Sequence, residues 1–249
     1  RHRAYQGRRQ AEGGLTSIMR GSIKLFNIFG ISINIHITFL FLLIFFLSGG
    51  IKWLVLMIGV FCFVTLHEIC HSMMARYYGI DVREITLLPI GGIASMSSMP
   101  EKPIQEFFIS IVGPLFNLAV IVIFYNPMKS LLGPEVLFHR PFSTATWPLT
   151  LAYLYWINLM LAVFNLIPAF PMDGGRVLRS LLAGRIGYGK ATKFAVGLGH
   201  IFAIVFAYFG VVNANLMLIA VAIFIYMAAS NEGHQVDVRE ALKKFKIGE

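Results

Sequence analysis

Long apolar stretches separated by short polar segments dominate the sequence. Each is close to the roughly 20 residues that a helix needs to cross about 30 Å of hydrocarbon. A spanning segment must satisfy its own backbone hydrogen bonds, and continuous rather than alternating apolar runs exclude a β-barrel. The pattern predicts an all-α polytopic membrane protein with six transmembrane helices, the last two forming a tight hairpin around Asn213. The six stretches cover approximately residues 33–49, 53–76, 106–126, 148–168, 194–212 and 214–230.

The segment 80–99 has a different pattern. Apolar and polar residues alternate up to Leu88, and the alternation breaks at Pro89, Gly91 and Gly92. Alternation followed by turn residues is typical of a β-hairpin, so we expect a short hairpin at the membrane surface. The alternative is an amphipathic segment that only covers the helices.

Composition and charge agree with a membrane protein. Hydrophobic residues make up 57% of the chain and charged residues only 13%, and the net charge is +9; soluble domains have about 25% charged residues. Of the 21 Lys and Arg residues, all but Lys52, Lys129 and Arg140 lie on one side of the six expected spans. The positive-inside rule then places both termini in the cytoplasm. The basic residues are better explained by a lipid bilayer than by nucleic acid.

The polar ends of the chain suggest its domain organisation. Residues 1–17 are Arg-rich and lack apolar periodicity, which indicates a disordered arm, a tag remnant or misassigned upstream sequence. Residues 18–230 form the expected six-helix core. We expect residues 231–249 to be a cytoplasmic tail or a linker stub.

The second apolar stretch contains a metal-binding pattern, His67-Glu68-Ile69-Cys70-His71. Histidines four residues apart on a helix face the same point, so both imidazoles can bind one zinc ion while Glu68 reaches an adjacent water. Ionisable side chains within a membrane span are costly unless they are paired or bind a metal. The rise of a helix places His71 about 10 Å from the cytoplasmic end of this span.

Catalytic zinc usually takes three protein ligands, and Asp173 is a candidate for the third. It follows Pro168 and Pro171, which end the fourth apolar stretch, and it precedes Gly174-Gly175. The expected topology puts its carboxylate on the same side of the membrane as the histidine pair. Two interpretations stay open from these residues alone: a metal ligand, or a residue that simply starts the next helix.

Together these motifs resemble the site-2 protease family of intramembrane zinc metalloproteases, in particular its six-helix archaeal and sporulation-type members. The resemblance covers roughly residues 19–230 and rests on HEICH, LLPIGG, GPLFN and NLIPAFPMDGGR. It implies that His67, His71 and Asp173 bind one zinc ion and that Glu68 is the catalytic glutamate. It also implies a transmembrane protein as the substrate.

Two asparagines are weaker candidates for substrate binding. Asn117 lies in the third apolar stretch, where it would either position a substrate or hydrogen-bond a neighbouring helix. Asn165 would either hold the substrate backbone or cap the backbone groups that Pro168 leaves unpaired.

The expected reaction is metal-assisted hydrolysis of a peptide bond within a membrane segment. Two alternatives stay open. One is another membrane zinc peptidase, such as an enzyme that trims prenylated C-termini; the NLIPAFPMDGG segment argues against it. The other is a metal-binding transporter, which we would expect to carry polar residues along a path across the membrane rather than at one depth.

Overall fold

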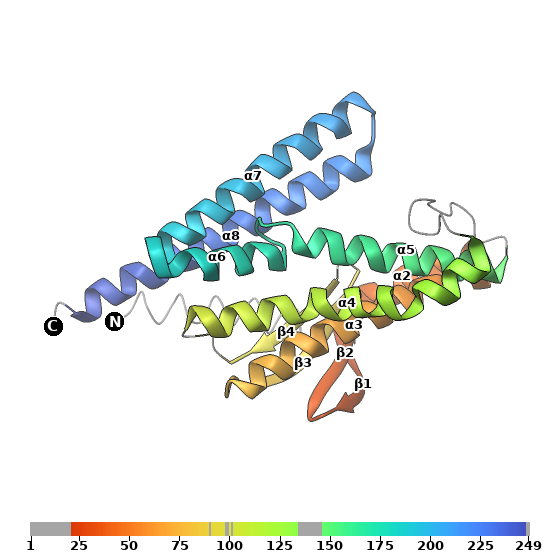
Figure 1. The fold of residues 1–249 in the computed structure, drawn as a ribbon, viewed down its shortest axis with the longest axis horizontal. Helices are drawn as coiled ribbons and strands as arrows, with labels where there is room; N and C mark the ends of the chain where they lie inside the picture. The colour runs from red at the N-terminus through yellow and green to blue at the C-terminus, as the bar shows by residue number, and fades with distance from the viewer. Residues whose placement is uncertain (1–20, 90, 98–99, 101, 134–145, 248–249) are drawn as a thin grey trace. The chain divides into compact units, whose positions relative to one another are not determined.

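A computed structural model of the chain describes residues 21–89, 91–97, 100, 102–133 and 146–247 (Figure 1). The expected N-terminal arm, residues 1–17, lies outside the described residues. By internal packing the chain divides into two units, one formed by residues 1–99 and 119–159 and the other by residues 100–118 and 160–249.

The first unit contains four strands and the first two helices of the described chain. The second contains the last three helices, and two long helices contribute residues to both. The bounds are β1 Ser22–Ile28, β2 Ile31–His36, α2 Ile37–Ser48, α3 Ile51–Tyr77, β3 Val82–Leu88, β4 Gly91–Met96, α4 Pro103–Leu132, α5 Trp147–Leu166, α6 Asp173–Ile186, α7 Tyr188–Val212 and α8 Leu216–Ile247.

The strands form one sheet in the order β1-β2-β3-β4. β3 and β4 are antiparallel neighbours, which confirms the hairpin expected within residues 80–99. β1 and β2 are also antiparallel, and β2 pairs in parallel with β3. β1 and β2 were not predicted: the mainly helical chain carries a four-stranded sheet rather than a single hairpin.

The first expected span, residues 33–49, is only partly helical. Residues up to His36 belong to β2, and α2 has 12 residues, which is about 18 Å at the rise of an α-helix. That length is short of the about 30 Å of a hydrocarbon core. The mistake has a physical cause: Ile31, Ile33 and Ile35 alternate with polar residues in a strand, but next to α2 they look like part of one apolar run.

The other five expected spans are confirmed as long apolar helices. Within the described residues, five helices have the length and composition to cross a membrane: α3, α4, α5, α7 and α8. α7 and α8 form the expected hairpin (Figure 1). Its turn closes where the amide of Asn215 donates to the carbonyl of Gly210 at 2.7 Å, and Ala214 has a positive φ of 50°.

The hydrophobic core of the first unit lies between the sheet and the helices α2 and α3. Ile33 of β2 and Ile85 of β3 are completely buried and belong to one cluster with Ile69 of α3. In the same cluster the rings of Phe39 on α2 and Phe61 on α3 meet edge to face, 4.4 Å apart. The two central strands therefore pack on the part of α3 that carries the candidate metal ligands.

Candidate metal centre

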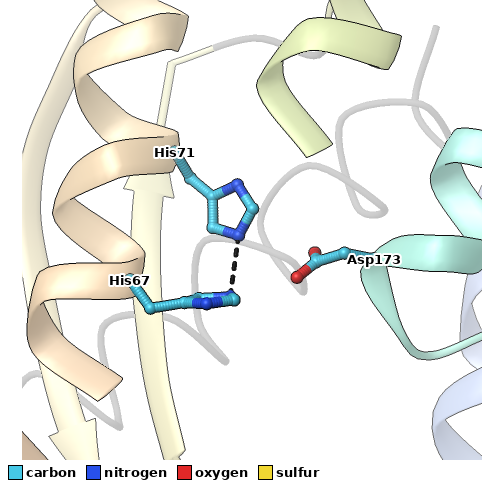
Figure 2. A group of neighbouring side chains, drawn as sticks. All are labelled: His67, His71 and Asp173. Atoms are coloured by element: carbon cyan, nitrogen blue, oxygen red, sulfur yellow. Dashed lines mark hydrogen bonds between the residues drawn. The ribbon is translucent and has the colours of Figure 1, made fainter. Parts of the chain in front are cut away.

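His67 and His71 lie one turn apart on α3 and face the same point (Figure 2). Both are buried, with exposed fractions of 4% and 6%. Their Nε2 atoms are 2.9 Å apart, and their ring planes are nearly perpendicular. The four-residue spacing therefore produces the converging imidazoles that the motif predicted.

Glu68 follows His67 on α3 and packs against the sheet. A β-carbon added to Gly92 of β4 would lie 2.8 Å from Cγ of Glu68, closer than side chains approach one another. The side chain of Glu68 therefore rests on the bare backbone of β4. Gly92, which the sequence analysis treated only as a turn residue, creates the space for the candidate catalytic carboxylate.

Asp173 is the first residue of α6, and Met172 is the N-cap without a side-chain hydrogen bond. The start of α6 packs closely on the segment that leads into it. A β-carbon on Gly174 would lie 2.3 Å from the carbonyl oxygen of Ile167, and one on Gly175 would lie 2.5 Å from the carbonyl carbon of Ala169. The two glycines thus allow the close approach that presents the Asp173 carboxylate.

The three candidate ligands form one group (Figure 2). His67, His71 and Asp173 each offer one ligand atom, and these atoms all lie within 4.8 Å of one another. Ligand atoms about 2.0–2.1 Å from a tetrahedral zinc ion are about 3.3 Å apart. The two histidine nitrogens, 2.9 Å apart, are close to this spacing, and the carboxylate oxygen lies no more than 4.8 Å from them. Two imidazoles and one carboxylate are ligands that zinc takes in proteins. Asp173 both starts a helix and belongs to the group, so the two interpretations of this residue are compatible.

The two asparagines that were candidates for substrate binding differ in exposure. Asn117 is completely buried on α4, and Asn165 is half-buried near the end of α5. Neither is part of the metal-binding group. Cys70, next to His71, is half-buried and also lies outside the group.

Comparison with known proteins assigns the family. The model of "Peptidase family M50" matches residues 55–133 and 126–206, which together include both histidines, Glu68 and Asp173. The chain belongs to peptidase family M50. The predicted resemblance to the site-2 proteases is therefore confirmed.

Relatives of this M50 chain carry informative names. It is 40% identical over 235 residues to the zinc metalloprotease MJ0392 of Methanocaldococcus jannaschii, covering 92% of this chain and 65% of that protein. It is 32% identical over 211 residues to sll0528 of Synechocystis, covering 80% of this chain and 53% of that protein. The chain thus spans less than two thirds of the length of these two relatives.

A solved structure has the same fold as this M50 chain. The site-2 protease from Methanocaldococcus jannaschii superposes with a TM-score of 0.62 at 39% sequence identity. The alignment covers 85% of this chain and 95% of the other. The similarity therefore extends over most of the helices and strands described above.

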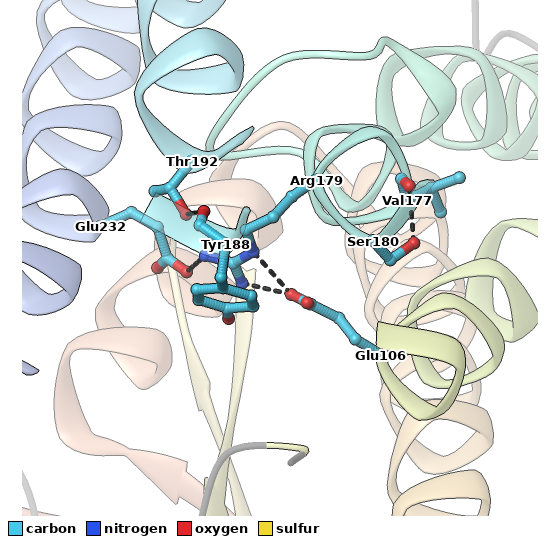
Figure 3. Close-up of polar contacts among 7 residues, drawn as sticks. All are labelled: Glu106, Val177, Arg179, Ser180, Tyr188, Thr192 and Glu232. Carbon is cyan, nitrogen blue, oxygen red and sulfur yellow. Dashed lines mark hydrogen bonds and ion pairs between the residues drawn. The ribbon is translucent and has the colours of Figure 1, made fainter. Parts of the chain in front are cut away.

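The M50 chain also has a buried charged cluster that the sequence analysis missed, formed by Arg179, Glu106 and Glu232 (Figure 3). The sequence analysis counted Arg179 only as a cytoplasmic basic residue. One signal was present in the sequence: Glu106 is an acidic residue at the start of an apolar stretch, where a charge needs a partner. No pattern indicated which residue that partner is.

Proposed function

We propose that this chain is an intramembrane zinc metalloprotease that hydrolyses peptide bonds in transmembrane segments of other proteins. The observation that carries the proposal is the group of three ligand atoms, within 4.8 Å of one another, on His67, His71 and Asp173. Three protein ligands with a fourth position left for water are typical of catalytic zinc sites. The names of the relatives, zinc metalloprotease and site-2 protease, support the same activity.

In this proposal, His67, His71 and Asp173 hold one zinc ion. When bound, zinc supplies Lewis-acid chemistry, because it lowers the pKa of water from 15.7 toward about 7 and polarises a carbonyl group. Glu68 is the general base: it takes a proton from the attacking water and delivers it to the leaving nitrogen. Water thereby adds hydroxyl to the carbonyl carbon, the C–N bond breaks, and the nitrogen leaves as an amine.

The sheet offers a way to hold the substrate. A transmembrane helix keeps its carbonyl groups in its own hydrogen bonds, so a substrate must unwind before hydrolysis. β4 is the outer strand of the sheet, and an extended peptide can add to such an edge through main-chain hydrogen bonds. Contact between Gly92 and Glu68 would bring this peptide close to the general base. Asn117 and Asn165 stay candidates with two roles each: both could bind substrate, while Asn117 could instead hydrogen-bond a neighbouring helix and Asn165 could cap the backbone groups that Pro168 leaves unpaired.

We further propose six membrane crossings, with both termini in the cytoplasm. Five of these crossings are the long apolar helices α3, α4, α5, α7 and α8, and the sixth is the short apolar helix α2, whose 12 residues extend about 18 Å. α2 begins where β2 ends, and α3 leads to β3 in the same sheet, so the two helices run antiparallel from a common side. Residues 18–230 then form the catalytic core, and 231–249 continue α8 as a cytoplasmic tail.

The decisive experiment compares the wild-type protein with Glu68→Gln in liposomes that contain a membrane-anchored model substrate. Zinc content is measured by mass spectrometry and cleavage by gel electrophoresis. We expect about one zinc ion per chain in both proteins. Cleavage should fall by about 10²–10⁴-fold in Glu68→Gln, because general acid–base catalysis contributes a factor of this size.

Glu84→Gln is the matched control. Glu84 accepts a hydrogen bond from Nδ2 of Asn34 at 2.6 Å, and a glutamine oxygen can accept the same bond. This variant should keep both zinc and cleavage. Wild-type cleavage by Glu68→Gln would contradict the proposal, and zinc transport into the liposomes without cleavage would favour a transporter.

A further inference from the structure

A buried arginine on α6 makes an ion pair with each of two carboxylates (Figure 3). Nε of Arg179 donates to Oε1 of Glu106 on α4 at 2.8 Å, and Nη2 donates to the same oxygen. Nη1 donates to Oε1 of Glu232 on α8 at 2.9 Å. The side chains of Arg179 and Glu106 are 3% and 5% exposed, and that of Glu232 is 13% exposed. The cluster thus joins three helices of the second unit.

The guanidinium also lies against two aromatic rings. Its central carbon lies 4.7 Å from the ring centre of Phe170 and 4.8 Å from that of Tyr188. A planar guanidinium can donate hydrogen bonds in its plane and stack on rings above and below, which an ammonium group cannot do. The contacts therefore fix both the position and the plane of the Arg179 head group.

Phe170 connects this cluster to the metal ligand, because it lies three residues before Asp173. Its side chain is only 1% exposed, and its amide donates to the carbonyl of Ala195 on α7 at 3.2 Å. A β-carbon on Gly199 of α7 would lie 2.1 Å from the carbonyl oxygen of Phe170, so the two backbones are in direct contact. The segment before Asp173 is thus held by α7 through its backbone and by Arg179 through its ring.

The segment after Asp173 is tied to the same cluster. Arg179 lies six residues further along α6, which is about 9 Å along a rigid helix. Arg179 therefore fixes α6 relative to Phe170, and Asp173 lies between these two anchored points. A shift of the Asp173 backbone would therefore disturb the ion pairs or the ring contact.

We propose that Arg179, together with Glu106 and Glu232, is a positioning residue that holds Asp173 in the geometry needed to bind the metal ion. This inference rests on the proposed function, because it gives Asp173 the role of a metal ligand. Buried ion pairs replaced by well-packed apolar residues often leave stability unchanged or raised, so a contribution to stability alone does not account for the cluster. Groups that orient a metal ligand typically change metal affinity or activity by 10–100-fold when they are altered.

The test uses the full chain, purified in detergent, with two kinds of variant. Arg179→Lys keeps the positive charge but loses the planar fork and the stacking. The triple variant Arg179→Met, Glu106→Leu and Glu232→Leu removes all three charges, so that none is left buried without a partner. Zinc affinity is measured by chelator competition, folding by thermal denaturation, and metal coordination by the visible spectrum after replacement of zinc with cobalt.

We expect Arg179→Lys and the triple variant to unfold at temperatures close to that of the wild type, with zinc affinity 10–100-fold lower. Their cobalt spectra should differ from the wild-type spectrum, and kcat should fall while KM stays unchanged. Arg185→Met is the matched control, since Arg185 is an exposed arginine on the same helix. It should keep wild-type zinc affinity and spectrum.

Two reference measurements separate this inference from the proposed function. If the wild type binds no zinc, or if His71→Ala binds as much as the wild type, the proposed function fails. If those references behave as expected but a folded Arg179→Lys or triple variant has wild-type affinity and spectrum, only the positioning role is overturned. If one of the two variants does not fold, the zinc affinity and cobalt spectrum of the other variant decide whether Arg179 has the positioning role. Unfolding of both would make the cluster a determinant of the fold, and that outcome also overturns the proposal.

Discussion

The carboxylate of Glu68 is positioned by a residue without a side chain. Because Gly92 has no β-carbon, the methylene groups of Glu68 can lie directly on β4. The same glycine thus lies between the helix that carries the candidate metal ligands and the strand that we propose as the substrate edge. Replacement of Gly92 by alanine adds one methyl group and therefore tests the contact between β4 and Glu68.

We expect Gly92→Ala to lower cleavage by about 10–100-fold while zinc content stays at the wild-type level. The added β-carbon would lie 2.8 Å from Cγ of Glu68 and push the carboxylate aside, and a shift of about 1 Å can cost up to 10²-fold in rate. Cleavage assays and metal analysis on the same preparation check this.

Gly184→Ala is the control for this substitution, because nothing lies within 4 Å of a β-carbon added there. Alanine is favoured over glycine inside a helix by about 1 kcal/mol, so this variant should be as active as the wild type and slightly more stable. Loss of zinc together with activity in Gly92→Ala would show that the substitution disturbs more than Glu68.

At the scale of elements, the contact of α7 with the segment before α6 determines how closely the second unit packs. Gly199 touches the carbonyl oxygen of Phe170, whereas Gly197, two residues earlier on the same helix, has open space around it. Both glycines lie within the same helix, but an added β-carbon would meet close neighbours only at Gly199. Only the one that faces the Asp173 segment should resist replacement.

We expect Gly199→Ala to destabilise the folded protein by about 1–3 kcal/mol, the usual range for an overpacked core. A β-carbon 2.1 Å from the Phe170 carbonyl oxygen would force α7 and this segment apart. Gly197→Ala should be neutral or stabilising by up to about 1 kcal/mol, because it gains helix propensity without a clash. Denaturation in detergent measures both; equal effects would refute the close contact.

The helical elements and the histidine pair were predictable because each depends on local order in the chain. Five long apolar runs become five long helices, and a four-residue spacing brings His67 and His71 together. β1 and β2 were missed although they form a local antiparallel hairpin, because the alternating residues of β2 run directly into the apolar residues of α2. The parallel pairing of β2 with β3, which lies far away in the sequence, leaves no local signal. The partners of Arg179 on α4 and α8 were unpredictable for the same reason.

At the scale of the whole molecule, the distribution of basic residues predicts the orientation in the membrane. All but three of the 21 Lys and Arg residues lie in the segments expected on the cytoplasmic side. The hairpin of β3 and β4 should then face the cytoplasm, and the turn between α7 and α8 should face the opposite side. Both locations contain exposed residues suitable for labelling, Ser97 and Asn213.

We expect Asn213→Cys, in a background with Cys62→Ala and Cys70→Ala, to react with a membrane-impermeant maleimide in intact cells. Ser97→Cys in the same background should react only after the membrane is made permeable. Mass shifts on gels measure both reactions. The reverse pattern would place the C-terminal end of α8 outside the cytoplasm, and equal labelling in intact cells would contradict the three crossings, α4, α5 and α7, that lie between the two residues.

The parallel pairing of β2 with β3 constrains how the protein is made. Ile33 pairs with Ile85, 52 residues later, and the whole α2–α3 hairpin lies between them. During synthesis β2 emerges from the ribosome long before β3, and its second edge can be covered only after α2 and α3 have been made and the chain has returned to the sheet. Gly92 belongs to the strand added after that step. The surface on which the side chain of Glu68 rests is therefore absent from the growing chain until β4 has been made.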